Sequence, residues 1–185
     1  MSVDEYLAAE DGSAVRHEYL AGQVVAMVGA SRTHNLLAGA LFGRLQPLAR
    51  RRGCQLFFAD MKLRIDHEGE SWFYYPDLLV SCDRDDRDPL FVRNPCLVVE
   101  VLSPGTEQVD TREKLLAYRL LPSLRQYLLI RQDRVQADLY QRGDEGRWQH
   151  LRFTAEDAVL TLPCVGTEVT LRDVYCDVPE LLAQS

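Results

Sequence analysis

Long apolar runs and a leader segment are missing from this sequence. No apolar stretch in its 185 residues approaches the ~20 residues that a membrane-spanning helix needs. The first six residues, Met-Ser-Val-Asp-Glu-Tyr, are acidic and lack the basic and apolar regions of a signal peptide. We therefore expect a cytoplasmic protein with no membrane partner. The apolar share of 46% and the chain length suit one globular domain over residues 1–185.

Cysteine pairs with metal-ligand spacing are also missing. The number of cysteines is odd, and no two of them have Cys-x-x-Cys spacing. We therefore expect neither a disulfide framework nor a structural zinc site, but buried thiols in a reducing compartment. The five positions are Cys54, Cys82, Cys96, Cys164 and Cys176.

Positive charge is scarce, and lysine is scarcer still. The net charge of −7 argues against a protein held on nucleic acid by bulk charge, although a local basic cleft can coexist with it. Nineteen of the 21 basic residues are arginines, and the lysines are Lys62 and Lys114. Lysine differs from arginine because burial can move its pKa. Both lysine positions are therefore candidates for a specific role.

The hydrophobic pattern predicts helices and strands in mixed order, with no internal repeat. This order favours an α/β or α+β fold with one mixed sheet flanked by helices, an N-terminal helix and hairpin, and additional C-terminal strands. Pro47 is expected to kink the second helix or end it early. The predicted helices are 4–9, 31–52 and 111–121, the last capped by Asp110, and the predicted strands are two within 17–28, then 55–65, 72–81, 96–102, 125–130, 134–140, 147–153 and 167–171.

Glu100 interrupts the most apolar of these strands, Leu-Val-Val-Glu-Val-Leu. A buried ionised carboxylate is costly unless it is paired or bound to a metal. We therefore interpret Glu100 as a site residue, the alternative being a strand-end glutamate or one paired with an arginine.

Asp77 is a candidate site residue because of its expected position near Glu100. The dipeptide Pro76-Asp77 alone is common in turns. If strands 72–81 and 96–102 are neighbours, however, both carboxylates reach one point at the sheet edge. Two carboxylates, with water and substrate oxygens, suit a hard divalent ion such as Mg²⁺.

Lys114 lies on a largely apolar stripe of its predicted helix, together with Ala117, Tyr118 and Leu121. It is therefore expected to point toward protein. A lysine there could help deprotonate an attacking water or balance charge on a pentavalent phosphate. The alternative is a lysine that snorkels at the edge of the apolar face.

These residues carry a resemblance to a known family. Residues 75–80 (Tyr-Pro-Asp-Leu-Leu-Val), 95–104 (Pro-Cys-Leu-Val-Val-Glu-Val-Leu-Ser-Pro) and 110–118 are similar to the Uma-two-type restriction endonuclease family of the PD-(D/E)XK nuclease superfamily. Weaker likeness extends to residues 17–22, His34 and residues 162–166, so that it spans roughly residues 5–180.

The resemblance implies a four-stranded mixed core sheet flanked by helices, and phosphodiester cleavage that depends on Mg²⁺ or Mn²⁺. It implies that Asp77 and Glu100 are metal ligands and that Glu18 completes the metal site, although a solvent-facing hairpin glutamate is an equal alternative. The superfamily pattern would place lysine at position 102, which is Leu102 here. The resemblance implies that Lys114 has taken over its catalytic role.

Two further features are interpreted as bystanders. His34 resembles a cleft residue, but a satisfied histidine at a helix end is the favoured interpretation. Asp60 and Lys62 have suitable residue types on one strand face, yet that face is expected to be exposed to solvent.

The leading hypothesis is thus a Mg²⁺-dependent DNA endonuclease with Asp77, Glu100 and Lys114 as catalytic residues. The alternative is an inactive nuclease fold that serves as a binding or assembly module, which the acidic charge and Leu102 favour. Hydrolysis of another phosphate ester is a third hypothesis. Nucleases of this superfamily often pair, which favours a homodimer.

Overall fold

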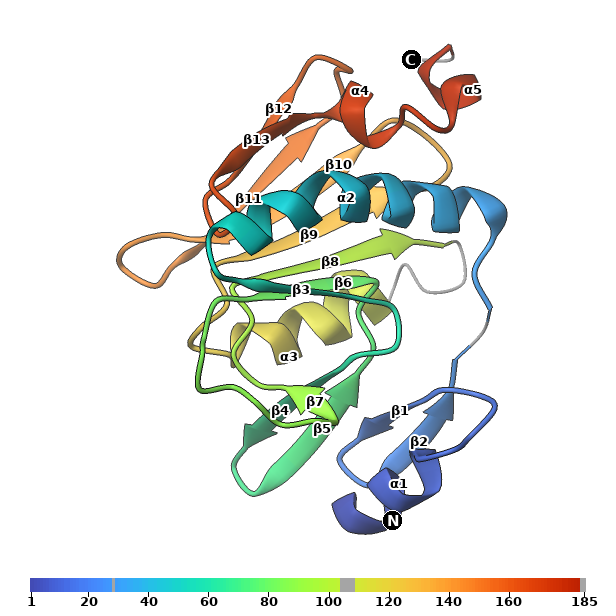
Figure 1. Ribbon diagram of the computed structural model, residues 1–185, viewed down its shortest axis with the longest axis vertical. Coiled ribbons are helices and arrows are strands. Elements are labelled where there is room, and N and C mark those ends of the chain that lie inside the picture. Colours follow the sequence, from blue (N-terminus) through green and yellow to red (C-terminus); the bar gives the residue numbers. More distant parts are fainter. Residues whose placement is uncertain (28, 104–108, 184–185) are drawn as a thin grey trace.

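The computed structural model describes residues 1–27, 29–103 and 109–183, apart from the side chains of Val109 and Asp110. Within these residues the centre of the fold is a six-stranded sheet (Figure 1). The pair β8–β9 is parallel, and the other neighbours are antiparallel. The strand order is β11 (Trp148–Phe153), β10 (Ala137–Arg142), β9 (Gln126–Arg131), β8 (Leu97–Leu102), β6 (Leu78–Ser81) and β3 (Gln55–Phe58).

The described residues form two smaller sheets as well, so the expectation of one sheet is wrong. The five-stranded sheet has the order β2 (Gln23–Ala26), β1 (His17–Leu20), β5 (Glu70–Tyr74), β4 (Lys62–His67) and β7 (Phe91–Val92). Helix α1 (Val3–Glu10) packs on it through Tyr6, whose ring contacts Tyr19 and Phe73. The third sheet pairs β12 (Val159–Leu162) with β13 (Thr167–Thr170), and the short helices α4 (Leu171–Val174) and α5 (Pro179–Leu182) follow.

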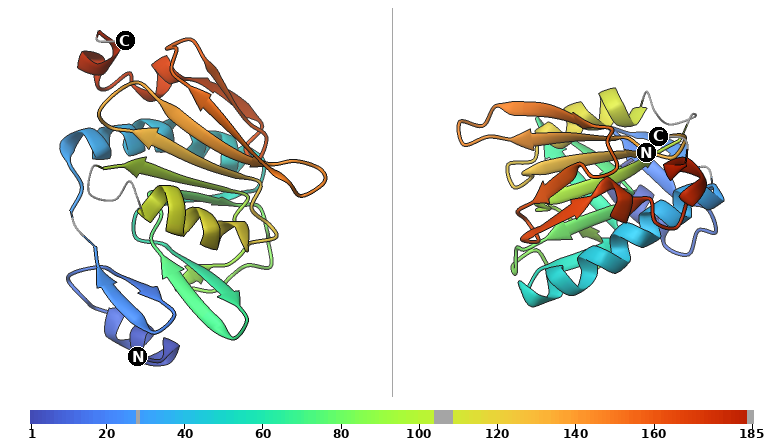
Figure 2. Two further views of the ribbon diagram at one scale, coloured as in Figure 1. Left: turned by 180° about the vertical axis from the view of Figure 1, so that it is seen from behind. Right: turned by 90° about the horizontal axis from the view of Figure 1, so that it is seen from above.

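Two helices cover opposite faces of the central sheet. Figure 1 shows α2 (Arg32–Arg51) in front of the sheet, and the reverse view in Figure 2 shows α3 (Leu115–Arg119) in front. Because side chains alternate along a strand, β8 sends Val99 and Val101 into the core under α2 and Val98 and Leu102 into the core under α3. The Glu100 side chain is on the same side of the strand as Val98 and Leu102, so it lies on the α3 face.

Two predicted strands are each divided between two sheets. Segment 55–65 becomes β3 and β4, and segment 72–81 becomes β5 and β6. At the first break Ala59 has φ +59°, and at the second Pro76 has no N–H to donate to a ladder. The Ala59 N–H donates to the Asp77 carbonyl, at 3.0 Å, so the two breaks lie together. Asp77 therefore stands where the chain enters the central sheet.

The two main helices differ from expectation in their details. Helix α2 is capped by Ser31, and it passes Pro47 and continues to Arg51, so the proline does not end it. The last predicted helix begins instead as a π-helix, η1 (Val109–Lys114), before the short α3. The Asp110 side chain, the predicted cap, lies outside the described residues. π-helical turns are frequent at functional sites, and this one carries Lys114.

The prediction of separate buried thiols is wrong. Cys54 is bonded to Cys82 and Cys96 to Cys164, while Cys176 is free and exposed. The partners are 28 and 68 residues apart, and spacing along the chain does not reveal contacts of that range. In the described part of the chain we find no helix with the length and apolar character of a membrane span.

Candidate functional site

The site forms where β6 begins and β8 approaches its end. The predicted pairing of these strands is confirmed, with Leu78 opposite Val99. One step further in this register brings Asp77 beside Glu100. The backbone N–H of Val101 donates to Asp77 Oδ2 at 2.7 Å, which ties the carboxylate to β8. The two carboxylates are thus delivered to one place by adjacent antiparallel strands.

His34 is the second partner of Asp77. Its Nε2 lies 3.1 Å from Asp77 Oδ2. The Ser31 side chain accepts the His34 N–H and so fixes the first turn of α2 at this point. The expected histidine with a partner at a helix end is therefore confirmed, and its partner is a residue of the site. The sequence signal that placed His34 near the cleft was the family resemblance. The local residue pattern added no support to it.

Lys114 lies between two glutamates. Its Nζ is 3.1 Å from Glu100 Oε1 and 3.0 Å from Glu18 Oε1. The prediction that Lys114 points toward protein is confirmed, since only 6% of the residue is exposed. Glu100, at 5% exposure, is equally buried, so both charges depend on this pairing.

Tyr118 was placed on the Lys114 stripe by sequence, but its polar role was missed. One helical turn after Lys114, its hydroxyl donates to Glu100 Oε1 at 3.0 Å. Complete burial, reinforced by the charge of Glu100, raises the pKa of Tyr118 well above its ordinary value. The hydroxyl therefore stays protonated and remains a hydrogen-bond donor to Glu100.

Glu18 lies on β1 of the five-stranded sheet, and further polar residues hold its side chain in place. Glu18 Oε1 accepts the Tyr75 N–H at 3.4 Å, and the Tyr75 hydroxyl donates to Glu10 Oε1 at 2.8 Å. Burial raises the pKa of Tyr75, and its bond to Glu10 raises it further. Burial alone would raise the pKa of Glu10, but hydrogen bonds from His17 and Tyr75 lower it on balance. Sequence patterns did not indicate Glu10, which lies near the end of an unremarkable helix.

Several of the site residues line a cavity of about 320 Å³. Asp77, Glu100, Lys114 and His34 contribute to its wall. Asp60 is at its rim, with 72% of its side chain exposed and an ion pair to Arg16, so the expected exposure of Asp60 is confirmed. Lys62 is only half-buried and lies over the Tyr75 ring. Burial lowers the pKa of Lys62.

The donor set of the cavity fits a hard divalent cation of the Mg²⁺ class. Both side-chain contacts of Asp77 use Oδ2, and among the described residues Oδ1 accepts no hydrogen bond. Two carboxylates with room for water and phosphate oxygens match the ligands that Mg²⁺ prefers. Among the described residues, however, oxygens of Asp77, Glu100 and Glu18 do not all lie within 4.8 Å of one another. Glu18 is therefore an ion-pair partner of Lys114, and its position does not by itself make it a third metal ligand.

Comparisons with known proteins find relatives over nearly the whole chain. A family model described as "Uma2: Putative restriction endonuclease" matches residues 3–173. Two uncharacterised proteins of Synechocystis sp. (strain PCC 6803) are each 35% identical to the chain. The first, slr1290, aligns over 95% of this chain and 91% of its own, and the second, sll1609, over 85% and 90%.

A solved structure shares the fold. It is the crystal structure of "a putative nuclease belonging to DUF820" from Anabaena variabilis, and it covers 95% of this chain and 98% of its own with a TM-score of 0.76. At 17% identity this likeness bears on fold alone, and it confirms the prediction of a mixed α/β, restriction endonuclease-like architecture. The family match covers nearly the whole chain and confirms the predicted resemblance. The chain therefore belongs to the Uma2 family of "putative restriction endonucleases".

Proposed function

We propose that this protein is a metal-dependent endonuclease that hydrolyses phosphodiester bonds in DNA. The observation that carries the proposal is the meeting of Asp77 and Glu100, from adjacent strands, in one cavity with Lys114 held against Glu100. Membership of the family supports the nuclease class. DNA as the substrate, Mg²⁺ or Mn²⁺ as the ion, a cytoplasmic location and a homodimer are the finer parts of the proposal.

Asp77 and Glu100 are the residues that would hold the ion. A bound Mg²⁺ or Mn²⁺ supplies Lewis-acid polarisation of the scissile phosphate and lowers the pKa of a bound water. Val101 and His34 fix the orientation of Asp77, and Tyr118 fixes that of Glu100. Such outer partners typically matter because they hold the ligand in its binding geometry.

Lys114 is the group that would act on the reacting water and phosphate. Its Nζ lies 3.1 Å from Glu100 Oε1, so it would lie next to any ion or water that Glu100 binds. A buried ammonium there balances the negative charge that develops on a pentavalent phosphate, and it orients the attacking water. Glu18 keeps the ammonium in place from the opposite side.

The second candidate function is a binding or assembly module built on an inactive nuclease fold. The net charge of −7 and the apolar Leu102 at the usual lysine position favour it. The ion pairs of Lys114 favour the endonuclease instead, because they hold the ammonium beside Glu100, where it can balance charge on a bound phosphate.

The test is cleavage of supercoiled plasmid DNA with Mg²⁺ or Mn²⁺, with and without a chelator. We expect nicking or linearisation that chelation abolishes and that Asp77→Asn reduces by more than about 100-fold. Asp66→Asn, an exposed aspartate on β4, is the matched control and should cleave normally.

Titration calorimetry with Mg²⁺ separates the two functions. Binding that is lost in Asp77→Asn supports the endonuclease. No binding at millimolar Mg²⁺ or Mn²⁺, together with no cleavage of plasmid DNA, would favour the module. Cleavage of a simple phosphate ester without cleavage of DNA would favour the third hypothesis. Sedimentation velocity tests the homodimer.

A further inference from the structure

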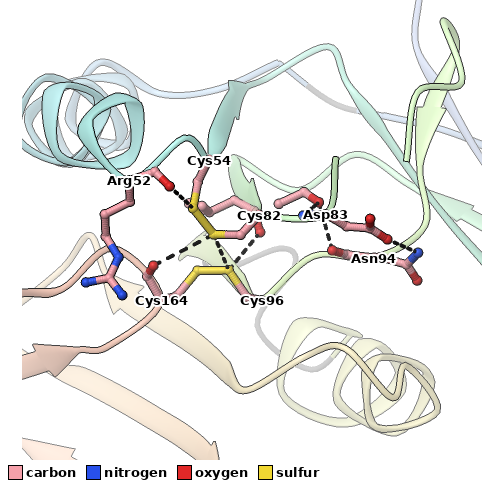
Figure 3. The surroundings of a disulfide bond; sticks show 9 residues. Arg52, Cys54, Cys82, Asp83, Asn94, Cys96 and Cys164 are labelled. Atoms are coloured by element: carbon pink, nitrogen blue, oxygen red, sulfur yellow. Dashed lines mark hydrogen bonds between the residues drawn. A yellow bond between two sulfur atoms is a disulfide. The ribbon is translucent and has the colours of Figure 1, made fainter. Parts of the chain in front are cut away.

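Four cysteines gather at one end of the central sheet (Figure 3), opposite to the end that carries Asp77 and Glu100. Cys54 precedes β3, Cys82 follows β6, Cys96 precedes β8, and Cys164 lies in the turn between β12 and β13. Asp77 precedes β6 and Glu100 lies late in β8, so the cysteines occupy the opposite end of the same antiparallel strand pair. At about 3.3 Å per residue, the four residues from Cys96 to Glu100 separate the two groups by about 13 Å.

Three of the four sulfurs lie close together, and the fourth, that of Cys54, is bonded to one of them, Cys82. Besides the bonds within each pair, Cys82 Sγ lies 3.6 Å from Cys96 Sγ, which belongs to the other pair. The sulfurs of Cys82, Cys96 and Cys164 all lie within 4.8 Å of one another. Four thiolates around one tetrahedral Zn²⁺, each at about 2.3 Å, would lie about 3.8 Å apart. Two independent cross-links would not need to meet in this way.

The cysteines are also held in place by the backbone. The Cys96 N–H donates to the Val80 carbonyl at 2.7 Å, and the Cys54 N–H donates to the Ala49 carbonyl at 2.9 Å. Ligands fixed on a strand and at a helix end lose little freedom when they bind an ion. The cluster is reachable from solvent, because Cys82 is exposed and Cys96 and Cys164 are half-buried.

Positive charge lies beside the cluster. A Cβ at Gly166, two residues after Cys164, would meet the Arg52 guanidinium. A Cβ at Gly53, next to Cys54, would lie 3.2 Å from the Arg84 guanidinium. Four thiolates and one Zn²⁺ carry a net charge of −2, and two neighbouring arginines can offset it.

We propose that, once both disulfides are reduced, Cys54, Cys82, Cys96 and Cys164 bind one Zn²⁺ as a structural tetrathiolate site. A dithiol reductant delivers two electrons and two protons to each disulfide and is itself oxidised to a disulfide. The four thiols then release four protons as their thiolates bind Zn²⁺. Sulfur ligands favour Zn²⁺ over Mg²⁺, and four protein ligands leave no position for a substrate. The ion would join the α2–β3 junction, the β6–β8 pair and the β12–β13 turn.

The test uses the full chain, reduced with a dithiol, loaded with Zn²⁺ and desalted without oxygen. We expect about one zinc per chain by elemental analysis. Co²⁺ in place of Zn²⁺ should give the intense visible absorption of tetrahedral thiolate coordination. The double variant Cys82→Ser/Cys164→Ser should lose more than about 100-fold in Zn²⁺ affinity. Cys176→Ser, which removes the cysteine outside the cluster, should retain the full zinc content.

Two results would contradict the proposed zinc site. A reduced wild-type chain that retains no zinc and gives no thiolate–Co²⁺ absorption would overturn the proposal, whether or not the variants fold. So would zinc retention that is equal in the wild type and the double variant. Counting thiols in the same samples confirms that both disulfides were reduced before the metal was added.

Discussion

The two ends of the β6–β8 strand pair carry opposite chemistry. At one end are carboxylates and a lysine around a cavity of about 320 Å³; at the other, four cysteine sulfurs are joined in pairs. Oxygen ligands bind hard ions loosely enough to exchange water and substrate, whereas sulfur ligands bind soft ions or one another tightly. The difference indicates that one end is suited to reaction and the other to holding the strands together. If the two ends act independently, a change at one end should leave the other unaltered.

Glu100→Gln should have the largest effect. Removing a metal ligand is expected to lower DNA cleavage and Mg²⁺ affinity by more than about 100-fold, measured by plasmid cleavage and calorimetry. Zinc uptake at the cysteine end after reduction should not change. Glu68→Gln, a surface glutamate with 85% of its side chain exposed, is the control. Simultaneous loss of zinc would show that the two ends are coupled.

Lys114→Met should separate binding from chemistry. Cleavage is expected to fall by about 10²–10⁴-fold, because the group that orients the water and balances charge is gone. Mg²⁺ binding should hold or tighten, because the ammonium no longer competes for Glu100 Oε1. Lys62→Met removes the other lysine and should change neither measurement. A fall in Mg²⁺ affinity equal to the fall in cleavage would contradict the assigned roles.

The oxidised cysteine end should contribute to stability. Replacing Cys82 and Cys164 by serine breaks both disulfides and should lower the free energy of unfolding by about 2–5 kcal/mol in denaturant titrations. Cys176→Ser should stay within about 0.5 kcal/mol of the wild type. Equal stability of the double variant and wild type under non-reducing conditions would refute a clamping role.

Tyr118→Phe should have a smaller effect at the carboxylate end. It removes the hydroxyl that donates to Glu100 Oε1, and the loss should cost about 1–3 kcal/mol of stability. It should also weaken Mg²⁺ binding by about 10-fold or more, because Glu100 is less well oriented. Tyr140→Phe, a partly buried tyrosine on β10, is the control for loss of a hydroxyl. Unchanged Mg²⁺ affinity would assign Tyr118 to packing alone.

The smallest effect concerns acid. Because the pKa of Glu10 is lowered in the folded protein, its stabilisation is present above its ordinary value of 4.5 and is lost as the pH falls below it. Glu10→Gln should cost on the order of 1 kcal/mol at pH 7 and should flatten this part of the acid dependence. Thermal unfolding between neutral pH and pH 3 measures both. A variant whose acid dependence matches the wild type would remove Glu10 from this account.

Local sequence was sufficient for the main elements and for the most unusual residue. Apolar residues near helical spacing indicated α2, two strands were predicted within residues 17–28, and a run that is apolar on both faces indicated β8. Glu100 stood out because a charge in a strand that is buried on both faces needs a partner. The same reasoning placed Lys114 on the buried side of its helix, since the apolar stripe around it had helical spacing.

Tertiary structure alone decided which residues contact one another. An alternating pattern states which side chains are buried, but not which sheet a strand joins, so segments 55–65 and 72–81 were not recognised as two strands each. His34 met Asp77, and Glu18 met Lys114, only because α2 and β1 are brought to the same cavity. Cys96 and Cys164 are bonded across a sequence separation of 68 residues, and no spacing rule covers that distance. Contacts of this range are fixed by the packing of whole elements, which the order of residues does not express locally.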